Sequence, residues 1–408
     1  MLEANISRST RAGGWSAVFA LTLCVGTLIA SEFMPVSLLT PIAFDLSLSE
    51  GQAGQAIAVS GIFAVLTSLF IASATRGIDR RALLLWLTVA MMASGAMVAF
   101  APNFAVFMAG RALLGMVIGG FWSMSASTVM RLVSEDEVPR ALALLNGGNA
   151  LATTIAAPLG SFLGQYIGWR GAFFVVLPLA AVTFLWKFAT LPSMPAREQA
   201  GAGATFRVLA KPNVPLGIVA VTLFFAGQFA LFTYLRPFLE TVTQVDVLTL
   251  SLILLIMGGA GLAGTYVIGL VLKSRLYSVL IALPLAMAVI AFGLVEFGTS
   301  VAATTVLLAL WGMVGTAAPV GWWMWLAKVL PEDAEAGGGL MVAAIQLAIT
   351  LGATAGGLLF DASGYRATFA ASAVILCASA GVAFLASRSA AAAVRPAAVD
   401  ETLLAEVR

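Results

Sequence analysis

The chain has 408 residues, of which 61% are hydrophobic and only 10% are charged, and its mean hydropathy is +1.02. Soluble domains carry roughly 25% charged residues, so this composition indicates a polytopic membrane protein and excludes an ordinary soluble domain. The net charge of +2 is too small for a nucleic-acid-binding protein, and the sequence has no histidine for catalysis or metal binding, so we expect no cofactor, no metal and no nucleic-acid partner.

The first predicted element is the apolar run from residue 16 to residue 41, which carries Glu32 as its single ionisable residue. A helix needs roughly 20 apolar residues to cross the hydrocarbon core, so this run is long enough to span a membrane. It is too long for the apolar region of a signal peptide and lacks a small-residue cleavage site, so we expect a retained first span. A charge inside a span is costly, which makes Glu32 a candidate functional residue.

Apolar segments then follow one another with short connectors. We place twelve spans near residues 16–40, 52–75, 82–100, 104–130, 141–167, 171–191, 214–238, 247–272, 276–296, 300–327, 337–360 and 367–388. The longest interior break divides the chain into a six-helix bundle at 1–191, a cytoplasmic linker at 192–213, a second six-helix bundle at 214–388 and a cytoplasmic tail at 389–408. The predicted fold class is therefore an all-α polytopic membrane protein.

Basic residues are distributed unequally between the two predicted sides of the membrane. With a cytoplasmic N-terminus, the outer side receives only Arg170, Arg236 and Arg366, and nearly all other Lys and Arg residues fall on the inner side. Cytoplasmic connectors carry the excess of basic residues, so both termini are predicted to be cytoplasmic.

The two halves of the chain repeat weakly. The sequence GWR at 168–170 recurs as GYR at 364–366, which is 196 positions later, and GFW at 120–122 recurs as GWW at 321–323. Two six-span halves in parallel resemble the major facilitator fold, in which the substrate is held near the middle of the bilayer between the halves. We therefore expect two pseudo-symmetric six-helix bundles.

The connector after the second span contains Asp79, Arg80 and Arg81 in a short turn after Gly77. It resembles the signature loop between spans 2 and 3 of major facilitator transporters, although Thr75 stands where that family has a glycine. The resemblance implies that this acid and its arginines latch the cytoplasmic gate. The alternative is that these cations only anchor the inner membrane surface.

Span 4 carries Arg111, which resembles the buried arginine of span 4 in the same family. Arg111 lies seven residues from the predicted outer end of its span and Glu32 eight residues from the end of span 1, or roughly 10 and 12 Å deep at ~1.5 Å per residue. We predict that the two side chains pair, or compete for proton and substrate. A carboxyl whose distance from an arginine changes between outward- and inward-facing states would bind a proton in one and release it in the other. The alternatives are a static buried ion pair and an arginine that snorkels to the outer surface.

Span 5 contains two asparagines, Asn146 and Asn149, which would either bind substrate or join helices. The same span contains Pro158 and Gly160, in a segment that resembles the Gly/Pro motif of span 5 in the family's antiporters, with Ala157 where that motif has a glycine. A proline kink at a helix interface predicts a gating hinge here.

In the second half, three further candidate substrate contacts are Gln228 and Tyr234 in span 7 and Gln346 in span 11. Aligning the halves on Pro35 and Pro237 places Tyr234 opposite Glu32, so the proton site would belong to the first half alone. Amide and aromatic groups that face a cavity suit a neutral, flat, hydroxylated ligand. The tryptophans of span 10 are expected to pack or to form an interfacial belt.

Longer segments carry a resemblance over nearly the whole chain. They include EFMPVSLLTP at 32–41, GGFWSMSAS at 119–127, AAPLGSFLG at 156–164 and FAGQFA at 225–230. They are similar to the drug:proton antiporter-1 branch of the major facilitators, and within it to the bacterial purine ribonucleoside efflux pumps. This resemblance implies export of inosine- or guanosine-like nucleosides in exchange for protons across the bacterial inner membrane.

Three alternatives to nucleoside export stay open. Within the same branch they are a sugar exporter and a multidrug exporter, and outside it a non-transporting membrane sensor or structural protein. The sequence shows no nucleophile–base pair, metal cluster or phosphate loop, so we do not expect an enzyme. The expected partners are a small nucleoside-like substrate, protons and the lipid bilayer, and we expect a monomer.

Overall fold

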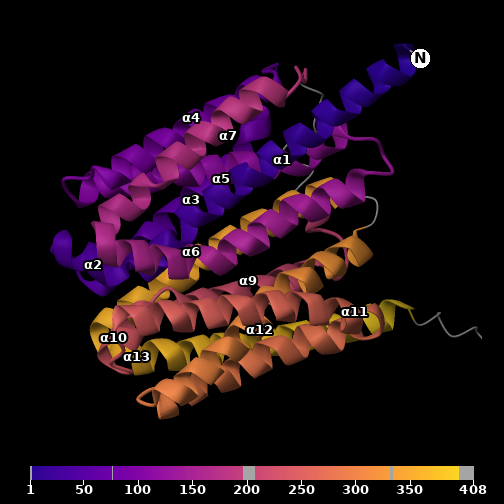
Figure 1. Ribbon diagram of the computed structural model, residues 1–408. Coiled ribbons are helices and arrows are strands. Elements are labelled where there is room, and N and C mark those ends of the chain that lie inside the picture. The colour runs from indigo at the N-terminus through magenta and orange to yellow at the C-terminus, as the bar shows by residue number, and fades with distance from the viewer. Residues whose placement is uncertain (1, 76, 196–206, 331–333, 395–408) are drawn as a thin grey trace, which may run out of the picture.

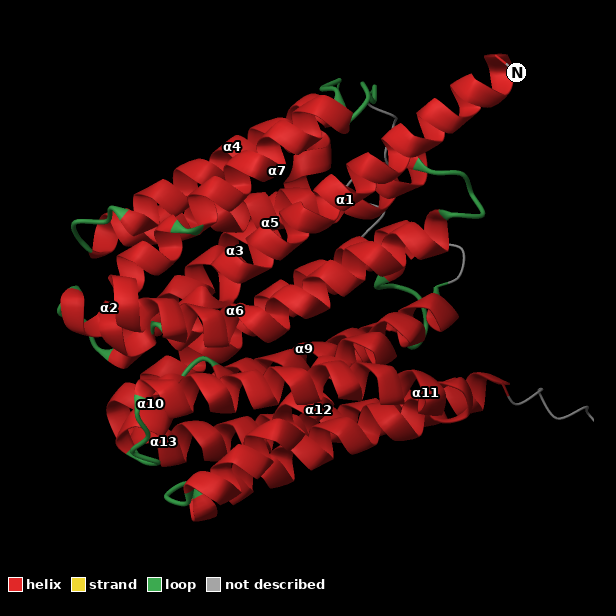
Figure 2. Cartoon of the chain, viewed as in Figure 1, coloured by secondary structure: helices red, strands yellow, loops and turns green. Residues whose placement is uncertain are grey.

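The computed structural model describes residues 2–75, 77–195, 207–330 and 334–394, and the regular structure in these ranges is helical (Figures 1 and 2). This confirms the predicted all-α class. Half of the predicted linker (residues 196–206) and most of the predicted tail (residues 395–408) lie outside the described residues, and the boundaries of the two bundles stay a prediction.

Polar side chains begin several of the helices. Ser49, Asn103 and Asp246 each accept a hydrogen bond from the backbone N–H three residues later, which satisfies a donor that the helix itself leaves free. The helices are α1 (Leu2–Ser37), α2 (Leu39–Asp45), α3 (Glu50–Ala74), α4 (Arg80–Ala99), α5 (Phe104–Leu132), α6 (Val138–Phe174), α7 (Val176–Thr190), α9 (Val214–Phe232), α10 (Leu235–Thr241), α11 (Val247–Phe297), α12 (Val301–Val329) and α13 (Ala334–Val394).

Ten stretches of the described chain are long and apolar enough to cross a membrane. Two of them, Arg140–Thr190 with 51 residues and Gly337–Ala390 with 54, are more than twice the roughly 20 residues that one span needs. Each contains a glycine with positive φ, Gly168 at +71° and Gly364 at +75°, a conformation that side chains with a Cβ rarely adopt. Dividing both stretches at these glycines gives twelve spans, and the count of twelve stays a prediction.

The internal repeat is visible in the backbone at an offset of 196 positions. Gly168 and Gly364 share their conformation, and the helix breaks at Leu38 and Tyr234, which are also 196 positions apart, each precede a helix of seven residues. At this offset the counterpart of Glu32 is Gln228, so the predicted equivalence of Tyr234 with Glu32 is wrong. The two prolines misled that alignment because Pro35 lies inside α1, whereas its supposed partner lies beyond the break, inside α10.

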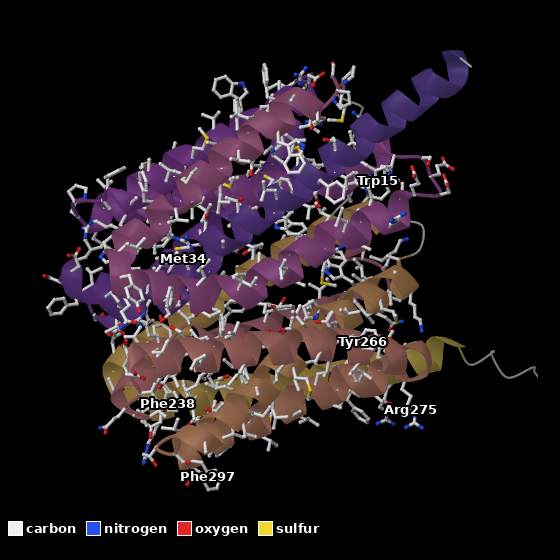
Figure 3. All side chains as sticks on the ribbon, viewed as in Figure 1. Trp15, Met34, Phe238, Tyr266, Arg275 and Phe297 are labelled. Atoms are coloured by element: carbon white, nitrogen blue, oxygen red, sulfur yellow. The ribbon has the colours of Figure 1, made fainter. Side chains whose placement is uncertain are left out.

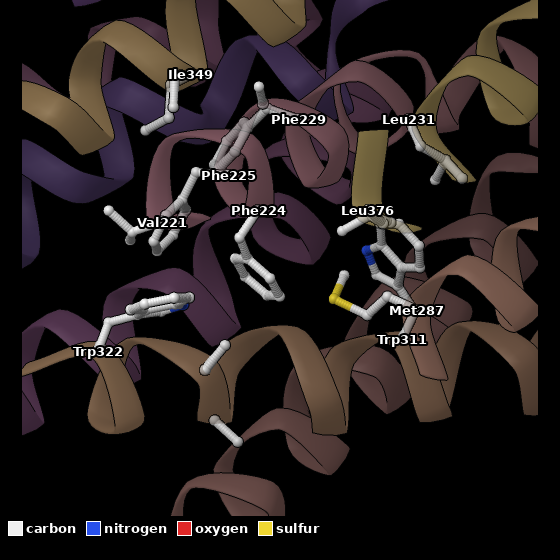
Figure 4. Packing of buried hydrophobic residues seen from close by; sticks show 14 of the residues in the cluster. Val221, Phe224, Phe225, Phe229, Leu231, Met287, Trp311, Trp322, Ile349 and Leu376 are labelled. Atoms are coloured by element: carbon white, nitrogen blue, oxygen red, sulfur yellow. The ribbon is translucent and has the colours of Figure 1, made fainter. Parts of the chain in front are cut away.

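The helices form two groups, α1–α7 and α9–α13, which Figure 1 shows in purple and in orange to yellow. Large apolar residues such as Phe224, Met287 and Trp311 fill the second group (Figure 4). Others, such as Trp86 and Val289, are exposed on the outside, as expected for side chains that contact lipid.

Two seams join the groups, α3 against α13 and α6 against α11. In the first, Thr350 Oγ1 donates to the carbonyl of Ala58 at 3.2 Å, and a Cβ added at Gly61 would lie 2.2 Å from that hydroxyl. In the second, Thr154 Oγ1 donates to the carbonyl of Gly258 at 3.4 Å, and a Cβ at Gly258 would lie 2.6 Å from the carbonyl oxygen of Thr154. Thr154 and Thr350 are 196 positions apart, so the interface between the groups repeats as well.

One end of the interface is held by a carboxylate. Asp361 of α13 accepts hydrogen bonds from the hydroxyl of Ser49 at 2.5 Å and from the backbone N–H of Gly51 at 2.9 Å, both at the start of α3. We call these three residues the Asp361 clasp. Nearby, the Arg236 guanidinium donates to the carbonyl of Ser37. Figure 3 shows that Phe238 and Phe297 lie toward one end of the molecule, and Trp15, Tyr266 and Arg275 toward the other. The clasp is at the Phe238 end, which is the predicted outer face.

Candidate functional site

A pocket opens between the two groups of helices near the middle of the molecule. It encloses about 500 Å³ of space, part of which is open to solvent. Both groups of helices contribute to its wall, so a ligand in the pocket would contact both. The lining residues are Phe33, Thr153, Thr154, Gln228, Phe229, Phe232, Met257, Gly258, Trp311, Gly312, Gly315 and Thr316.

Three phenylalanines form an aromatic wall across the interface. Phe33 of α1 stacks on Phe229 of α9, with ring centroids 5.7 Å apart and planes at 27°. Phe232 meets both rings edge to face. Such a wall offers ring faces and edges on which a flat heterocycle can stack.

Two buried polar atoms in the pocket wall have no hydrogen-bond partner among the described residues: Oε1 of Gln228 and Nε1 of Trp311. The first can only accept a hydrogen bond and the second can only donate one. A buried polar group without a partner costs about 1–3 kcal/mol, so both are suited to bind a ligand that brings a donor and an acceptor.

The carboxylate of Glu32 lies in the interface and not in contact with lipid. The residue is 3% exposed, and its Oε1 accepts a hydrogen bond from Nε2 of Gln346 at 3.2 Å. Because Glu32 is on α1 and Gln346 on α13, this bond joins the two groups of helices. The next residue, Phe33, lines the pocket. The proposed proton carrier and the pocket are therefore adjacent along one helix.

The predicted ion pair between Glu32 and Arg111 is not formed in this structure. The Arg111 guanidinium, which is fully buried, instead donates to the carbonyls of Ser31, Glu32 and Ala56 at 2.7, 3.1 and 3.0 Å and to the hydroxyl of Ser60 at 3.1 Å. It reaches the backbone of Glu32 and not its carboxylate. The snorkelling alternative is also wrong, because the side chain points inward.

A proline explains why Arg111 binds backbone oxygens. Pro35 lies inside α1 and has no N–H, so the carbonyl of Ser31, four residues earlier, lacks its usual helix donor. Arg111 Nη1 donates to that carbonyl at 2.7 Å. The arginine thus replaces the missing N–H and binds α1 one turn before the proline.

The structure brings two of the five predicted substrate contacts to this region. Gln228 lines the pocket and Gln346 binds Glu32. Tyr234 is fully buried near the Asp361 clasp, where its hydroxyl donates to the carbonyl of Ala353 at 2.8 Å. Asn146 is exposed and donates to the carbonyl of Leu142 in its own helix, and neither Asn146 nor Asn149 is part of the pocket wall.

The predicted gate residues of the loop before α4 hold two loops together within the first group. Asp79 accepts hydrogen bonds from the backbone of Arg81, from the hydroxyl of Ser193 and from the backbone of Met194. Burial raises the pKa of the Asp79 carboxyl, but these hydrogen bonds outweigh burial and leave its pKa below the usual value. Arg80 donates to Thr75 Oγ1.

Neighbouring cations fasten the same loops. Arg81 donates to the carbonyl of Phe188 and lies over its ring, and Arg131 donates to the carbonyl of Pro195. The latch role in the cytoplasmic gate stays a prediction.

The predicted hinge in α6 lies where that helix crosses α1. A Cβ at Gly160 would lie 2.6 Å from the hydroxyl of Ser37 and 3.1 Å from Met34, so the helices approach closely there. Pro158 removes the donor that the carbonyl of Thr154 would otherwise receive, and Gly258 packs on that oxygen. Pro35 and Pro158 thus each free a backbone carbonyl that a residue of another helix contacts.

Sequence reasoning left three residues without a role, two in the pocket wall and one at the Asp361 clasp. Phe33 and Trp311 line the pocket, and their signal was only that aromatic residues occur in spans 1 and 10. Of the other tryptophans of span 10, Trp322 and Trp325 are buried, as expected for packing residues, whereas Trp323 is 42% exposed. Glu50 opens α3 with a buried Oε2 that has no partner among the described residues. It was missed because the predicted span began two residues later.

A family profile and solved structures of similar fold both relate the chain to known membrane transporters. The profile of the Major Facilitator Superfamily matches residues 18–340. Among solved structures, a bacterial homologue of the human lysosomal transporter Spinster superposes with a TM-score of 0.75 at 16% identity, over 92% of this chain and 97% of that one. The human organic anion transporter MFSD10 gives a TM-score of 0.64 at 17% identity, over 91% and 99%. At these identities the likeness concerns the fold alone.

Relatives at higher identity carry two different names. The transcription regulatory protein OpdE of Pseudomonas aeruginosa is 59% identical over 383 residues, which are 93% of this chain and 95% of that one. The purine ribonucleoside efflux pump NepI of Salmonella paratyphi B is 42% identical over 376 residues, covering 91% and 95%, and that of Salmonella enteritidis is 41% identical over 380 residues, covering 92% and 96%.

Proposed function

The chain belongs to the Major Facilitator Superfamily and is a multi-pass membrane transporter and not an enzyme, and from that premise we propose that it is a proton-coupled antiporter that exports purine ribonucleosides such as inosine or guanosine. The relatives named as purine ribonucleoside efflux pumps support the substrate class. The positive-inside pattern supports cytoplasmic termini in the bacterial inner membrane.

The observation that carries this proposal is the chemistry of the pocket wall. A purine base is flat and would stack on the wall of Phe33, Phe229 and Phe232. Its ring nitrogens and the ribose hydroxyls offer both donors and acceptors, which match the free Gln228 Oε1 and the free Trp311 Nε1. A nucleoside is neutral, in keeping with a lining that contains no ionisable side chain.

The carboxyl of Glu32 supports the coupling to protons. Among the described residues Glu32 is the one acidic residue that is buried as a whole, and its partner Gln346 belongs to the opposite group of helices. A group in this position changes its surroundings when the two groups rock against each other, as alternating access requires. Proton exchange at Glu32 would then accompany each change of state.

Transport by inverted membrane vesicles tests the proposal. A vesicle lumen more acidic than the bath should drive accumulation of radiolabelled inosine, and Glu32→Gln should reduce the driven accumulation at least tenfold. Gln228→Leu should weaken apparent affinity about five- to tenfold, the effect of one buried hydrogen bond. Gln165→Leu, at an exposed glutamine of α6, is the matched control and should leave transport unchanged. Accumulation only of sugars or of lipophilic cations would refute the substrate assignment.

A second candidate function is a membrane sensor, favoured by the relative named a transcription regulatory protein. The present chain matches 95% of that relative, so little of it is left for a separate DNA-binding domain. A regulatory effect would then have to pass through a small molecule that the membrane helices bind or move. If purified protein binds inosine but moves no nucleoside, sugar or cation across a membrane, the sensor replaces the transporter as the proposed function.

A further inference from the structure

The side chain of Gln346 is placed to respond to the charge on Glu32. Gln346 is 7% exposed and lies on α13, and its Nε2 donates to Glu32 Oε1 at 3.2 Å across the interface. Its Oε1 is buried and has no partner among the described residues. One end of this amide is therefore used and the other is free.

The backbone around Gln346 is part of the α3–α13 seam. The single hydroxyl proton of Thr350 is shared between the carbonyl of Gln346 at 2.9 Å and the carbonyl of Ala58 on α3 at 3.2 Å. A Cβ at Gly61 would lie 3.0 Å from the Gln346 carbonyl oxygen. Because the seam fixes this turn of α13 against α3, separation of the two helices would carry the amide away from Glu32.

No other side chain of the described structure competes for the Glu32 carboxylate. Arg111 is the charged group that faces Glu32, and its four hydrogen bonds go to three backbone carbonyls and a hydroxyl. Ser60, which binds that guanidinium, and Gln346, which binds the carboxylate, do not titrate. The neutral amide is the side-chain partner of the carboxylate.

An amide can serve both forms of a carboxyl group. Its N–H donates to a carboxylate, and after a half-turn its C=O accepts the O–H of a protonated carboxyl. A hydrogen bond to the ionised form favours that form, and loss of the bond removes the preference.

We propose that Gln346 is the positioning residue that couples the protonation of Glu32 to the packing of α13 against α3. When the seam closes, the O–H bond of Glu32 breaks, the proton passes to water on the inner side, and the carboxylate accepts the Gln346 N–H in its place. When the seam opens, the carboxylate loses that donor and takes a proton from water on the outer side. This inference rests on the proposed proton-carrying role of Glu32.

Distance measurements between spin labels test the coupling without any substrate. Labels at residues 44 and 299, both exposed near the clasp end, report the separation of the two groups of helices in full-length protein whose free cysteines, Cys24 and Cys377, are replaced by serine. Between pH 5.5 and 8.5 we expect the closed population to rise about fivefold relative to the open one, the effect of one hydrogen bond. Gln346→Leu and the longer Gln346→Met should each reduce this change to less than about twofold.

The control is Thr354→Val, which removes another hydrogen bond between the groups, from Thr354 Oγ1 to Gln55, two turns further along α13. It should keep the full pH response. A pH response retained in both Gln346 variants, or absent in the parent protein, would overturn the proposal. A response that survives Glu32→Gln would instead refute the proton-carrying role of Glu32, so the two failures are distinguishable.

Discussion

The contact between Arg111 and the carbonyl of Ser31 makes a quantitative prediction about stability. Pro35 deprives that carbonyl of its helix donor, and Arg111 Nη1 supplies a donor at 2.7 Å. If Pro35→Ala restores the backbone N–H, the arginine becomes redundant for this one carbonyl. The two substitutions should therefore be coupled, because each removes the reason for the other.

The size of the coupling follows from the hydrogen bond that is shared. A hydrogen bond from a charged donor contributes about 1.5–3 kcal/mol in soluble proteins, and about 1–2 kcal/mol is measured for bonds between membrane helices. We expect Arg111→Met to be strongly destabilising, since it removes four buried hydrogen bonds and leaves the carbonyl of Ser31 without a donor. The double variant with Pro35→Ala should be about 1–2 kcal/mol more stable than the sum of the single effects.

The assay is the free energy of unfolding in bicelles, measured for the parent, both single variants and the double variant. Ser60→Ala is the matched control, because Ser60 accepts from the same guanidinium but has no relation to the proline. The cycle of Ser60→Ala with Pro35→Ala should be additive. Additivity within about 0.5 kcal/mol in the arginine cycle as well would refute the idea that Arg111 replaces the missing N–H.

Three further predictions concern the interface and the loops. Gly258→Ala should reduce inosine transport at least tenfold, because the new Cβ would lie 2.6 Å from the backbone of Thr154. The control Gly259→Ala, with open space around its Cβ, should retain the normal transport rate. Equal rates for the two variants would contradict the close packing of α6 against α11. Asp361→Asn removes a charged acceptor for Ser49 and Gly51, so the open population between labels 44 and 299 should rise about tenfold, and an unchanged population would show that the clasp carries no energy. The lowered pKa of Asp79 stabilises the fold at pH values above the ordinary carboxyl pKa near 4, and this stabilisation is lost as the pH falls through the lower pKa of the folded state. The melting temperature of the parent should therefore drop in that acid range, whereas that of Asp79→Asn should stay level. Parallel curves for the two proteins would contradict the stabilising role of Asp79.

The sequence was most informative where physics acts locally. Apolar length located the spans, and the glycine of the GWR and GYR sequences located two equivalent backbone turns at Gly168 and Gly364. Glu32 was expected to avoid lipid because a charge inside a membrane span is costly, and the structure buries its side chain within the protein.

The sequence was least informative about partners. Similar depth suggested that Arg111 would bind the Glu32 carboxylate, but depth does not show that a proline had freed a carbonyl that competes for the same donor. The partnership of Glu32 with Gln346 joins residues 314 positions apart, and it forms because α13 packs against α3 of the first group. The position of Tyr234 depended on a choice between two prolines, and the helix breaks settle it.

The exchange of acid for amide between the halves has an electrical consequence. At the position of Glu32 the second half has Gln228, so the repeat supplies no second carboxyl at this site. If the proposed antiport uses this carboxyl alone, each cycle would move one hydrogen ion inward while an uncharged nucleoside leaves, and every turnover would transfer one positive charge. The membrane voltage would then drive export together with acidity, at about 2.3 kcal/mol for each 100 mV. A cell with a flat pH gradient but an energised membrane could still empty itself of nucleosides by this route.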